Sequence, residues 1–174
     1  MTADPSGTDD ILLPFQVGDT AVRGRVVRLT GVIDKILNAH GYEAPVSELV
    51  GEAAALVSMM GASLKFDGKL IFQAQGDGPV SMVVADYSAN GALRAMASVN
   101  EPVPDTVRGA KSLLRNGHIA LTIDQGADME RYQGVTPIEG EGLSEMAVAY
   151  FLQSEQIPTV IRLAVGRVSA PGGG

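Results

Sequence analysis

The middle of the chain contains alternating segments that are joined by very short turn sequences. Residues 68–75, 80–87 and 92–98 alternate in the two-residue period of a strand with one buried face. The first two are separated by Gly76-Asp77-Gly78-Pro79 and the last two by Ser88-Ala89-Asn90-Gly91, both rich in turn-forming residues. Because such short connections join only antiparallel strands, this region predicts a three-stranded antiparallel meander.

Further strands and helices are predicted on both sides of this meander. Residues 13–29 form one long strand or two strands separated by a turn at residues 17–20. The other predicted elements are helices over residues 30–41, 45–63 and 105–114 and around residues 143–151, and strands over residues 118–124, 130–136 and 159–165. Helices and strands occur in blocks rather than in alternation. We therefore predict an α+β fold, a mainly antiparallel sheet packed with helices in a single domain.

Several local features can be predicted for the first half of the chain. Arg23 and Arg25 share one face of their strand, and Gly24 between them marks a bulge or a position of close approach. Thr30 is the expected N-cap of the first helix, and Gly41 is its expected C-cap.

The second helix is expected to be amphipathic. Glu48 and Glu52 lie on its expected water-facing side. The residues of its expected buried stripe are Val46, Leu49, Val50, Ala53, Val57 and Met60.

The ends of the chain differ in composition from its centre. Residues 1–10 are polar and acidic and are expected to be a disordered tail, whereas residues 169–174 are Gly-rich and are expected to begin a linker. Residues 11–168 then form the core domain. A content of 45% hydrophobic residues is enough for a packed core, which must be aliphatic because aromatic residues make up only 5%.

The charge balance excludes some classes of partner. The net charge is −7, from 13 basic and 20 acidic residues, and such a surface repels nucleic acid. The most apolar stretch, residues 44–64, is interrupted by Glu48 and Glu52, so no membrane span is expected. No signal peptide is recognisable at the N-terminus, and the chain has no cysteine, so a cytoplasmic location is expected.

No motif of catalysis, cofactor binding or metal binding stands out. Gly76-Asp77-Gly78 precedes a strand and not a helix, so it lacks the helix N-terminus of a phosphate-binding loop. The acidic residues around Gly126 do not have calcium-loop spacing, and His40 and His118 are not in a ligand pattern. We therefore predict no catalytic, cofactor-binding or metal-binding residues, and no enzyme.

A small-ligand-binding or enzymatic α+β domain remains the alternative. Its best polar residues would be Asp77, Asp124, His118 and Arg131, and a pocket that brings these side chains together would favour it.

Methionines are frequent on the predicted apolar faces. Because a methionine side chain adapts to irregular partners, such faces suit a surface that binds many sequences. A place in the core is the other interpretation, and composition does not decide between the two. The methionines in question are Met59, Met60, Met82, Met96 and Met146.

Several ordered motifs together resemble the Hsp33 family of redox-regulated molecular chaperones. The segment Lys65–Val80 is similar to the signature hairpin of that family, and residues 23–29 are similar to its opening strand. Glu130-Arg131-Tyr132-Gln133-Gly134-Val135 and the segment from Tyr150 to Thr159 are similar to two further family motifs. The resemblance covers essentially the whole chain.

The resemblance implies an ATP-independent cytosolic holdase that binds unfolded client proteins through apolar surface under oxidative or heat stress. In the family a separate C-terminal domain holds zinc through paired cysteines, and oxidation of these cysteines exposes the client-binding core and leads to dimers. This chain has no cysteine and resembles the core alone, so no cofactor is expected in it.

The resemblance suggests client contacts through large apolar side chains, although each candidate could equally belong to the core. A homodimer is expected to be possible, and a purely structural oligomerisation domain is a third interpretation. The candidate client-binding residues are Phe66, Phe72, Met82, Tyr132 and Tyr150.

Overall fold

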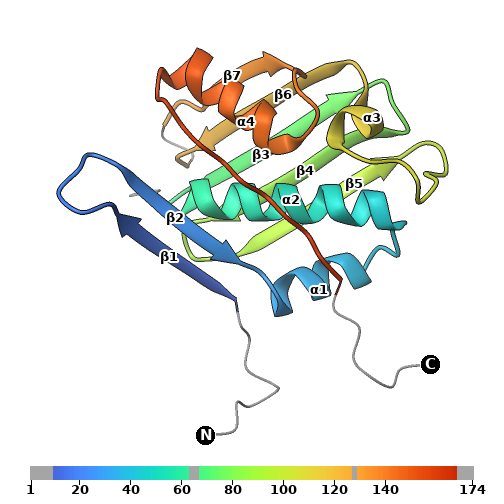
Figure 1. Cartoon of the computed structure of the whole chain (residues 1–174), viewed down its shortest axis with the longest axis horizontal. Helices are drawn as coiled ribbons and strands as arrows, with labels where there is room; N and C mark the ends of the chain where they lie inside the picture. Colours follow the sequence, from blue (N-terminus) through green and yellow to red (C-terminus); the bar gives the residue numbers. More distant parts are fainter. Residues whose placement is uncertain (1–9, 63–66, 127–128, 168–174) are drawn as a thin grey trace, which may run out of the picture.

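The structure is a computed structural model that describes residues 10–62, 67–126 and 129–167. These residues form a five-stranded antiparallel sheet in the order β5-β4-β3-β6-β7 and a separate two-stranded hairpin, β1-β2 (Figure 1). The strands are β1 (Ile11–Gln16), β2 (Arg23–Arg28), β3 (Lys69–Gly76), β4 (Val80–Ser88), β5 (Leu93–Val99), β6 (Gly117–Asp124) and β7 (Tyr132–Pro137). The helices are α1 (Gly31–Asn38), α2 (Ala44–Gly61), α3 (Ala110–Leu114) and α4 (Leu143–Tyr150), and α4 continues into a π-helical turn, Phe151–Glu155. The predicted α+β class is confirmed.

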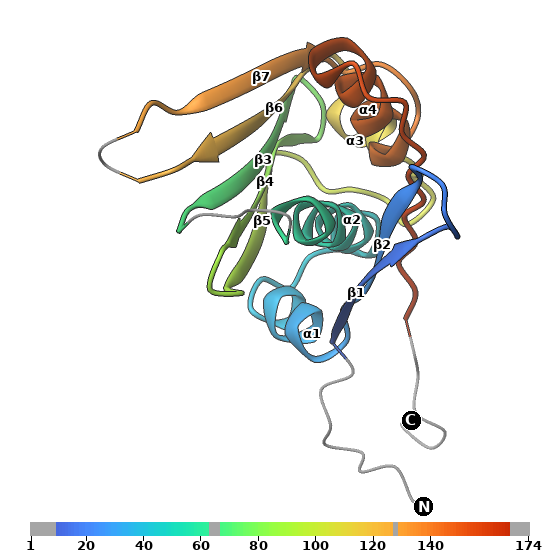
Figure 2. The ribbon, with the colours of Figure 1, turned by 90° about the vertical axis from the view of Figure 1, so that its left-hand side faces the viewer.

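The helices of the described residues lie on one face of the five-stranded sheet (Figure 2). The long helix α2 packs on β3, β4 and β5, and α4 lies against β7. The hairpin β1-β2 lies on the side of α2 that faces away from the sheet. Helix α2 is therefore covered from two sides, while the opposite face of the sheet is uncovered within the described part of the chain.

The core forms between α2 and the covered face of the sheet. Every second residue of a strand points toward α2, as the two-residue period predicts. Phe72 on the central strand β3 is the largest of these side chains and is 1% exposed. The buried strand residues on this face are Leu70, Phe72, Ala74, Val83, Ala85, Ala95, Ala97, Ile119 and Leu121.

Burial of α2 extends over most of its circumference. The expected stripe is confirmed at Val46, Leu49 and Val50, but Ala54 and Leu56, outside that stripe, are also buried. The predicted water-facing side is only partly correct. Glu48 is exposed, whereas Glu52 is half-buried, and burial with the added repulsion of Glu48 raises the pKa of its carboxyl group.

The turn between β3 and β4 is fixed by contact with the junction between α3 and β6. A Cβ atom at Gly76 would lie 1.9 Å from the carbonyl oxygen of Leu114, so only glycine fits there. The carboxylate of Asp77 accepts hydrogen bonds from the backbone and side-chain nitrogens of Asn116, at 2.9 and 3.2 Å. These bonds lower the pKa of Asp77. The motif that resembles a family signature thus has a structural reason for its glycine and its aspartate.

Several elements differ from the sequence predictions. The predicted strand over residues 159–165 is wrong, because this segment is extended but has no hydrogen-bonded partner strand within the described residues. The helix predicted over residues 45–63 ends at Gly61, and the one predicted from residue 105 begins at Ala110. The predicted helix around residues 143–151 is α-helical only to Tyr150.

The start of α1 also differs from the prediction. Thr30 makes no side-chain capping bond. The carboxylate of Asp10 accepts hydrogen bonds from the backbone N–H groups of Thr30 and Val32 instead, at 2.5 and 3.0 Å, and satisfies donors that the helix leaves free. Asp10, which was assigned to the disordered tail, is therefore an ordered capping residue. The predicted C-cap is displaced as well: α1 ends at Asn38 with Ala39 as its C-cap, and Gly41, with a φ of +63°, lies two residues further along and donates its N–H to Leu37 O.

We expect Gly76→Ala to lower the free energy of unfolding by about 1–3 kcal/mol or more, because the added methyl group would overlap a backbone carbonyl that cannot move without α3. Gly142→Ala is the matched control, since a Cβ atom there meets nothing within 4 Å, and its effect should stay within about 0.5 kcal/mol. Urea unfolding of both variants measures the difference. Equal stabilities would contradict the close approach.

Candidate functional site

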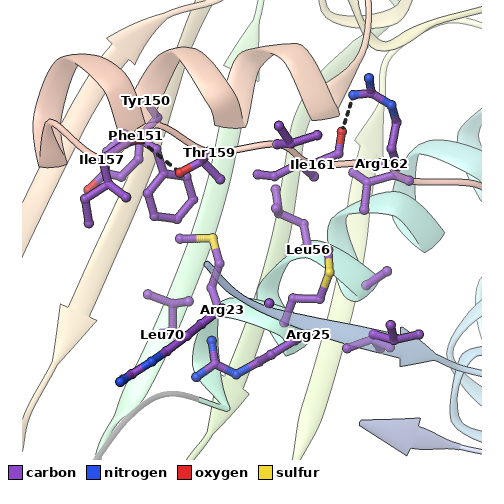
Figure 3. A pocket seen from close by; sticks show the side chains of 18 of the residues that line it. Arg23, Arg25, Leu56, Leu70, Tyr150, Phe151, Ile157, Thr159, Ile161 and Arg162 are labelled. Atoms are coloured by element: carbon purple, nitrogen blue, oxygen red, sulfur yellow. Dashed lines mark hydrogen bonds between the residues drawn. The ribbon is translucent and has the colours of Figure 1, made fainter. Parts of the chain in front are cut away.

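A groove of about 670 Å³ lies along the C-terminal half of α2, between the hairpin β1-β2 and residues 159–164, and it reaches the covered face of the sheet. Strand β2 forms one of its walls, residues 159–164 form the other, and α2 contributes Ala55, Leu56, Met59 and Met60 to its floor (Figure 3). The remaining lining residues are Phe15, Leu70, Leu121, Ile123, Tyr150, Phe151, Glu155 and Ile157. The groove is therefore mainly apolar, and it is open to solvent between two extended segments.

The hairpin beside the groove exposes several apolar side chains on one face. The predicted close approach at Gly24 is confirmed, because the ring of Phe15 on the paired strand lies where a Cβ atom would be, at 2.2 Å. The register places Phe15 and Gly24 on the same face as a set of other apolar side chains. The residues of this face, the hairpin apolar face, are Leu13, Phe15, Val17, Val22 and Val26, and all of them are about half exposed.

Exposed apolar side chains also occur on the opposite wall. Val160 is 80% exposed, and Ile157 is half exposed. Ile161 is instead buried and fixes this wall to the core. The groove thus has apolar side chains accessible to a ligand on both walls as well as on its floor.

Two of the sequence motifs meet at one end of the groove. The hydroxyl groups of Tyr150 and Tyr132 both donate to Oε1 of Glu155, at 3.2 and 3.4 Å. A Cβ atom at Gly134 would lie 2.5 Å from the Tyr150 hydroxyl, so glycine at this position of β7 lets the ring reach Glu155. Gln156 follows with a φ of +55°, which ends the π-helical turn and directs the chain along the groove.

Tyr150 has a perturbed titration at this position. Burial is the main reason why the pKa of its hydroxyl is raised, and the nearby carboxylate of Glu155 raises it further. The hydroxyl therefore keeps its proton and serves as a hydrogen-bond donor that fixes the end of α4.

The predicted client-contact residues fall in different places. Phe72 is fully buried and Tyr150 is nearly so, with part of Tyr150 lining the groove. Tyr132 is 46% exposed beside the groove. Met82 lies on the uncovered face of the sheet, where the amides of two glutamines contact its sulfur, and Phe66 is outside the described residues.

The main groove residues were missed as contact candidates. Phe15 and Val160 belong to segments whose alternation was recognised, but alternation alone does not show which face remains uncovered. Met59 and Met60 were identified as possible surface methionines, and both line the groove.

The alternative polar site is not supported by the geometry. Asp77 lies in the turn after β3, while Asp124 lies at the far end of β6, where Arg131 forms an ion pair with it at 3.1 Å. His118 faces the uncovered side of the sheet opposite Gln75. These side chains do not converge on one pocket. Among the described residues, no group of three or more His, Cys, Asp or Glu side chains could hold a metal ion, and no helix is long and apolar enough to cross a membrane.

Comparison with known proteins gives a family. The family model described as Hsp33 protein matches residues 10–173. The chain belongs to the Hsp33 family. Among curated relatives, the 33 kDa chaperonin of Caulobacter vibrioides is 52% identical over 98% of this chain and 58% of its own length. The 33 kDa chaperonins of Shewanella loihica and Escherichia coli O7:K1 are 39% and 38% identical, over 94% and 85% of this chain and 56% and 50% of their own lengths.

A solved structure confirms the fold. The 33 kDa chaperonin of Thermotoga maritima superposes with a TM-score of 0.77 at 21% identity, covering 87% of this chain and 53% of that one. The chain thus spans little more than half the length of the relatives it matches. Its 174 residues include no cysteine, so the thiolate ligands that the resemblance implies for zinc are not part of this sequence.

We expect Tyr150→Phe to lower the free energy of unfolding at pH 7 by about 1 kcal/mol, the usual net value of one hydrogen bond. Unfolded tyrosine ionises near pH 10, whereas the folded protein holds the Tyr150 proton to higher pH. The contribution of Tyr150 is therefore complete below pH 10 and is lost as the pH rises above it.

Denaturation measured between about pH 8 and pH 11 should show this loss in the unsubstituted protein and less of it in Tyr150→Phe. Tyr87→Phe, whose hydroxyl makes no hydrogen bond among the described residues, is the control at pH 7. An unchanged alkaline slope in Tyr150→Phe would contradict the assignment.

Proposed function

We propose that this chain is the client-binding core of an ATP-independent holdase chaperone, and that unfolded proteins bind in the groove on α2. The observation that carries the proposal is the apolar lining of this groove between β2 and residues 159–164, together with the exposed apolar side chains on both of its walls. Membership of a family whose relatives are named 33 kDa chaperonin supports it.

The groove suits many client sequences rather than one. Met59 and Met60 on its floor have flexible side chains that can adjust to different apolar partners. Contacts of this kind are not directional, and a client that buries about 400 Å² of apolar surface gains roughly 10 kcal/mol at 25 cal/mol per Å². Association costs about 4–15 kcal/mol in lost freedom, so binding is weak and reversible, as a holdase requires.

The uncovered face of the sheet is less suitable for this purpose. A row across the strands includes Val135, Val84 and Met96, but Gln73 on the central strand interrupts it. Asp86 and Arg94 form an ion pair on the same face, at 3.1 Å. Polar side chains at the centre of this face lower the apolar area that a client could bury there.

Homodimer formation is part of the proposal. The hairpin apolar face is exposed beside the groove, and apolar faces of this kind commonly pair with a second copy or a partner. No nucleotide is needed in this account, because burial of apolar surface supplies the binding energy.

We expect Ile157→Ser/Val160→Ser to reduce suppression of client aggregation several-fold, because both side chains are exposed on the groove and are lost without damage to the core. Light scattering of a heat-unfolding client without nucleotide measures the effect. Met96→Ser/Val135→Ser removes comparable apolar surface from the uncovered sheet face and should retain suppression. If Met96→Ser/Val135→Ser loses suppression of aggregation while Ile157→Ser/Val160→Ser retains it, clients bind the sheet face and not the groove.

A further inference from the structure

Residues 159–165, which include one wall of the groove, have the burial pattern of a β-strand but lack its backbone hydrogen bonds to other described residues. Ile161 is buried and Leu163 and Val165 are half-buried against the core, whereas Val160, Arg162 and Ala164 between them are exposed. This alternation over residues 160–165 is typical of a strand that is covered on one face. Among the described residues, however, no backbone hydrogen bond joins residues 159–165 to another segment.

Strand β2 presents a second unpaired edge to the same groove. The N–H of Val17 donates to Val22 O at 3.0 Å, which starts the ladder between β1 and β2. In an antiparallel pair the backbone groups of every second residue bond to the partner strand. The N–H and C=O groups of Gly24 and Val26 therefore point toward β1. The backbone groups of the alternate residues therefore point away from β1. No described residue forms a backbone hydrogen bond with them. These residues are Arg23, Arg25 and Val27.

Pro14 supports this assignment of the ladder. It is paired with Arg25, and it has no N–H to donate, so it fits only at a position that does not bond across the pair. The outer edge of β5 shows the opposite situation, since the N–H and carbonyl groups of Ala97 both bond to the Tyr42 hydroxyl, at 2.9 and 3.0 Å. One sheet edge is thus protected, while the edge of β2 is left open.

The two unpaired edges face one groove. When one face of a strand lines a cavity, only every second residue takes part. Here the lining includes the consecutive residues 23–27 and 159–164, as expected when the edge of each segment lines the cavity. Figures 1 and 2 both place β2 and this segment next to each other on the outer side of α2. The groove is therefore a slot between two backbone edges, with apolar side chains at its floor.

The charges at the slot are basic. Arg23 and Arg25 extend along it in the same direction (Figure 3) and form no ion pair among the described residues. Arg162 lines the other wall, and its guanidinium donates to Ile161 O at 2.8 Å and to no other described residue. Glu155, the one acidic side chain among the described residues that line the slot, already accepts hydrogen bonds from two tyrosine hydroxyl groups. In a chain of net charge −7, this concentration of unpaired arginine favours an occupant that carries carboxylates.

We infer that the slot holds a client segment as an added β-strand that pairs with the free edge of β2. The occupant is an extended, mainly apolar stretch of unfolded polypeptide with Asp or Glu side chains that reach Arg23 and Arg25. This inference rests on the proposed function and specifies its ligand. Main-chain pairing gives affinity that tolerates many sequences, while the arginines select acidic segments over basic ones.

Short fluorescent peptides test this inference. The peptides are alternating Leu/Glu, Leu/Gln and Leu/Lys sequences of roughly seven residues, about the length of β2 at 3.3 Å per residue. The Glu peptide should bind about tenfold more tightly than the Gln peptide and more tightly still than the Lys peptide, as two exposed ion pairs allow. Arg23→Gln/Arg25→Gln should remove this preference, and Lys35→Gln/Lys69→Gln, the same loss of two positive charges at exposed positions outside the slot, should preserve it.

Amide hydrogen exchange measured by NMR tests the strand pairing itself. Binding of the Glu peptide should slow exchange at the N–H groups of Arg23, Arg25 and Val27 by about tenfold or more, and should leave Gly24 and Val26 nearly unchanged. A Glu peptide N-methylated at alternate residues cannot donate along one edge and should lose this protection.

The outcomes separate this inference from the proposed function. Aggregation suppression without protection at Arg23, Arg25 and Val27 would overturn the strand pairing and leave the holdase in place. Equal affinity for the Glu, Gln and Lys peptides would overturn the role of the arginines.

Two further results concern the occupant. Slower amide exchange at Arg23, Arg25 and Val27 that grows with protein concentration, without peptide, would assign the slot to a second copy. Slower exchange that appears only in a longer chain, through residues beyond 174, would assign the slot to the protein itself. Either result would overturn the assignment to clients.

Discussion

Burial of α2 between two layers is the constraint on which the rest of the structure depends. The helix covers the apolar face of the five-stranded sheet and is itself covered by the hairpin β1-β2 and by residues 157–165. Small residues make this possible: at Gly51, for example, a Cβ atom would lie 2.9 Å from the side chain of Val165. The outer cover is incomplete, however, and the gap between its two parts is the groove. A single packing arrangement thus gives the domain its core and leaves part of an apolar helix accessible.

The sequence predicted the sheet well because its signals are local. Turn residues between β3, β4 and β5 fix an antiparallel meander, and the two-residue period fixes which side chains point inward. It failed where a structure depends on distant partners. Residues 159–165 have a strand pattern, but a strand also needs a partner that bonds to its backbone, and no described residue forms such a bond with this segment. Asp10 caps α1 from 20 residues away in sequence, which local capping rules could not reveal.

The candidate site could be predicted only in part for the same reason. The family resemblance identified the motifs around Tyr132 and Tyr150, but not that both tyrosines bind Glu155 at the end of a groove. Exposure of Val160 and of the hairpin apolar face depends on which surfaces other elements cover, and periodicity does not contain that information. The predicted contacts were accordingly a mixture of the buried Phe72, the exposed Tyr132 and Met82 on the other side of the sheet.

The central claim is that unfolded clients contact the groove and not the uncovered face of the sheet. Because the chain has no cysteine, a photo-reactive group can be attached at one introduced cysteine, Met59→Cys on the groove floor or Met96→Cys on the sheet face. Illumination with an unfolding client should then cross-link the client through position 59 and much less through position 96. Cross-linking mainly through position 96 would contradict the account.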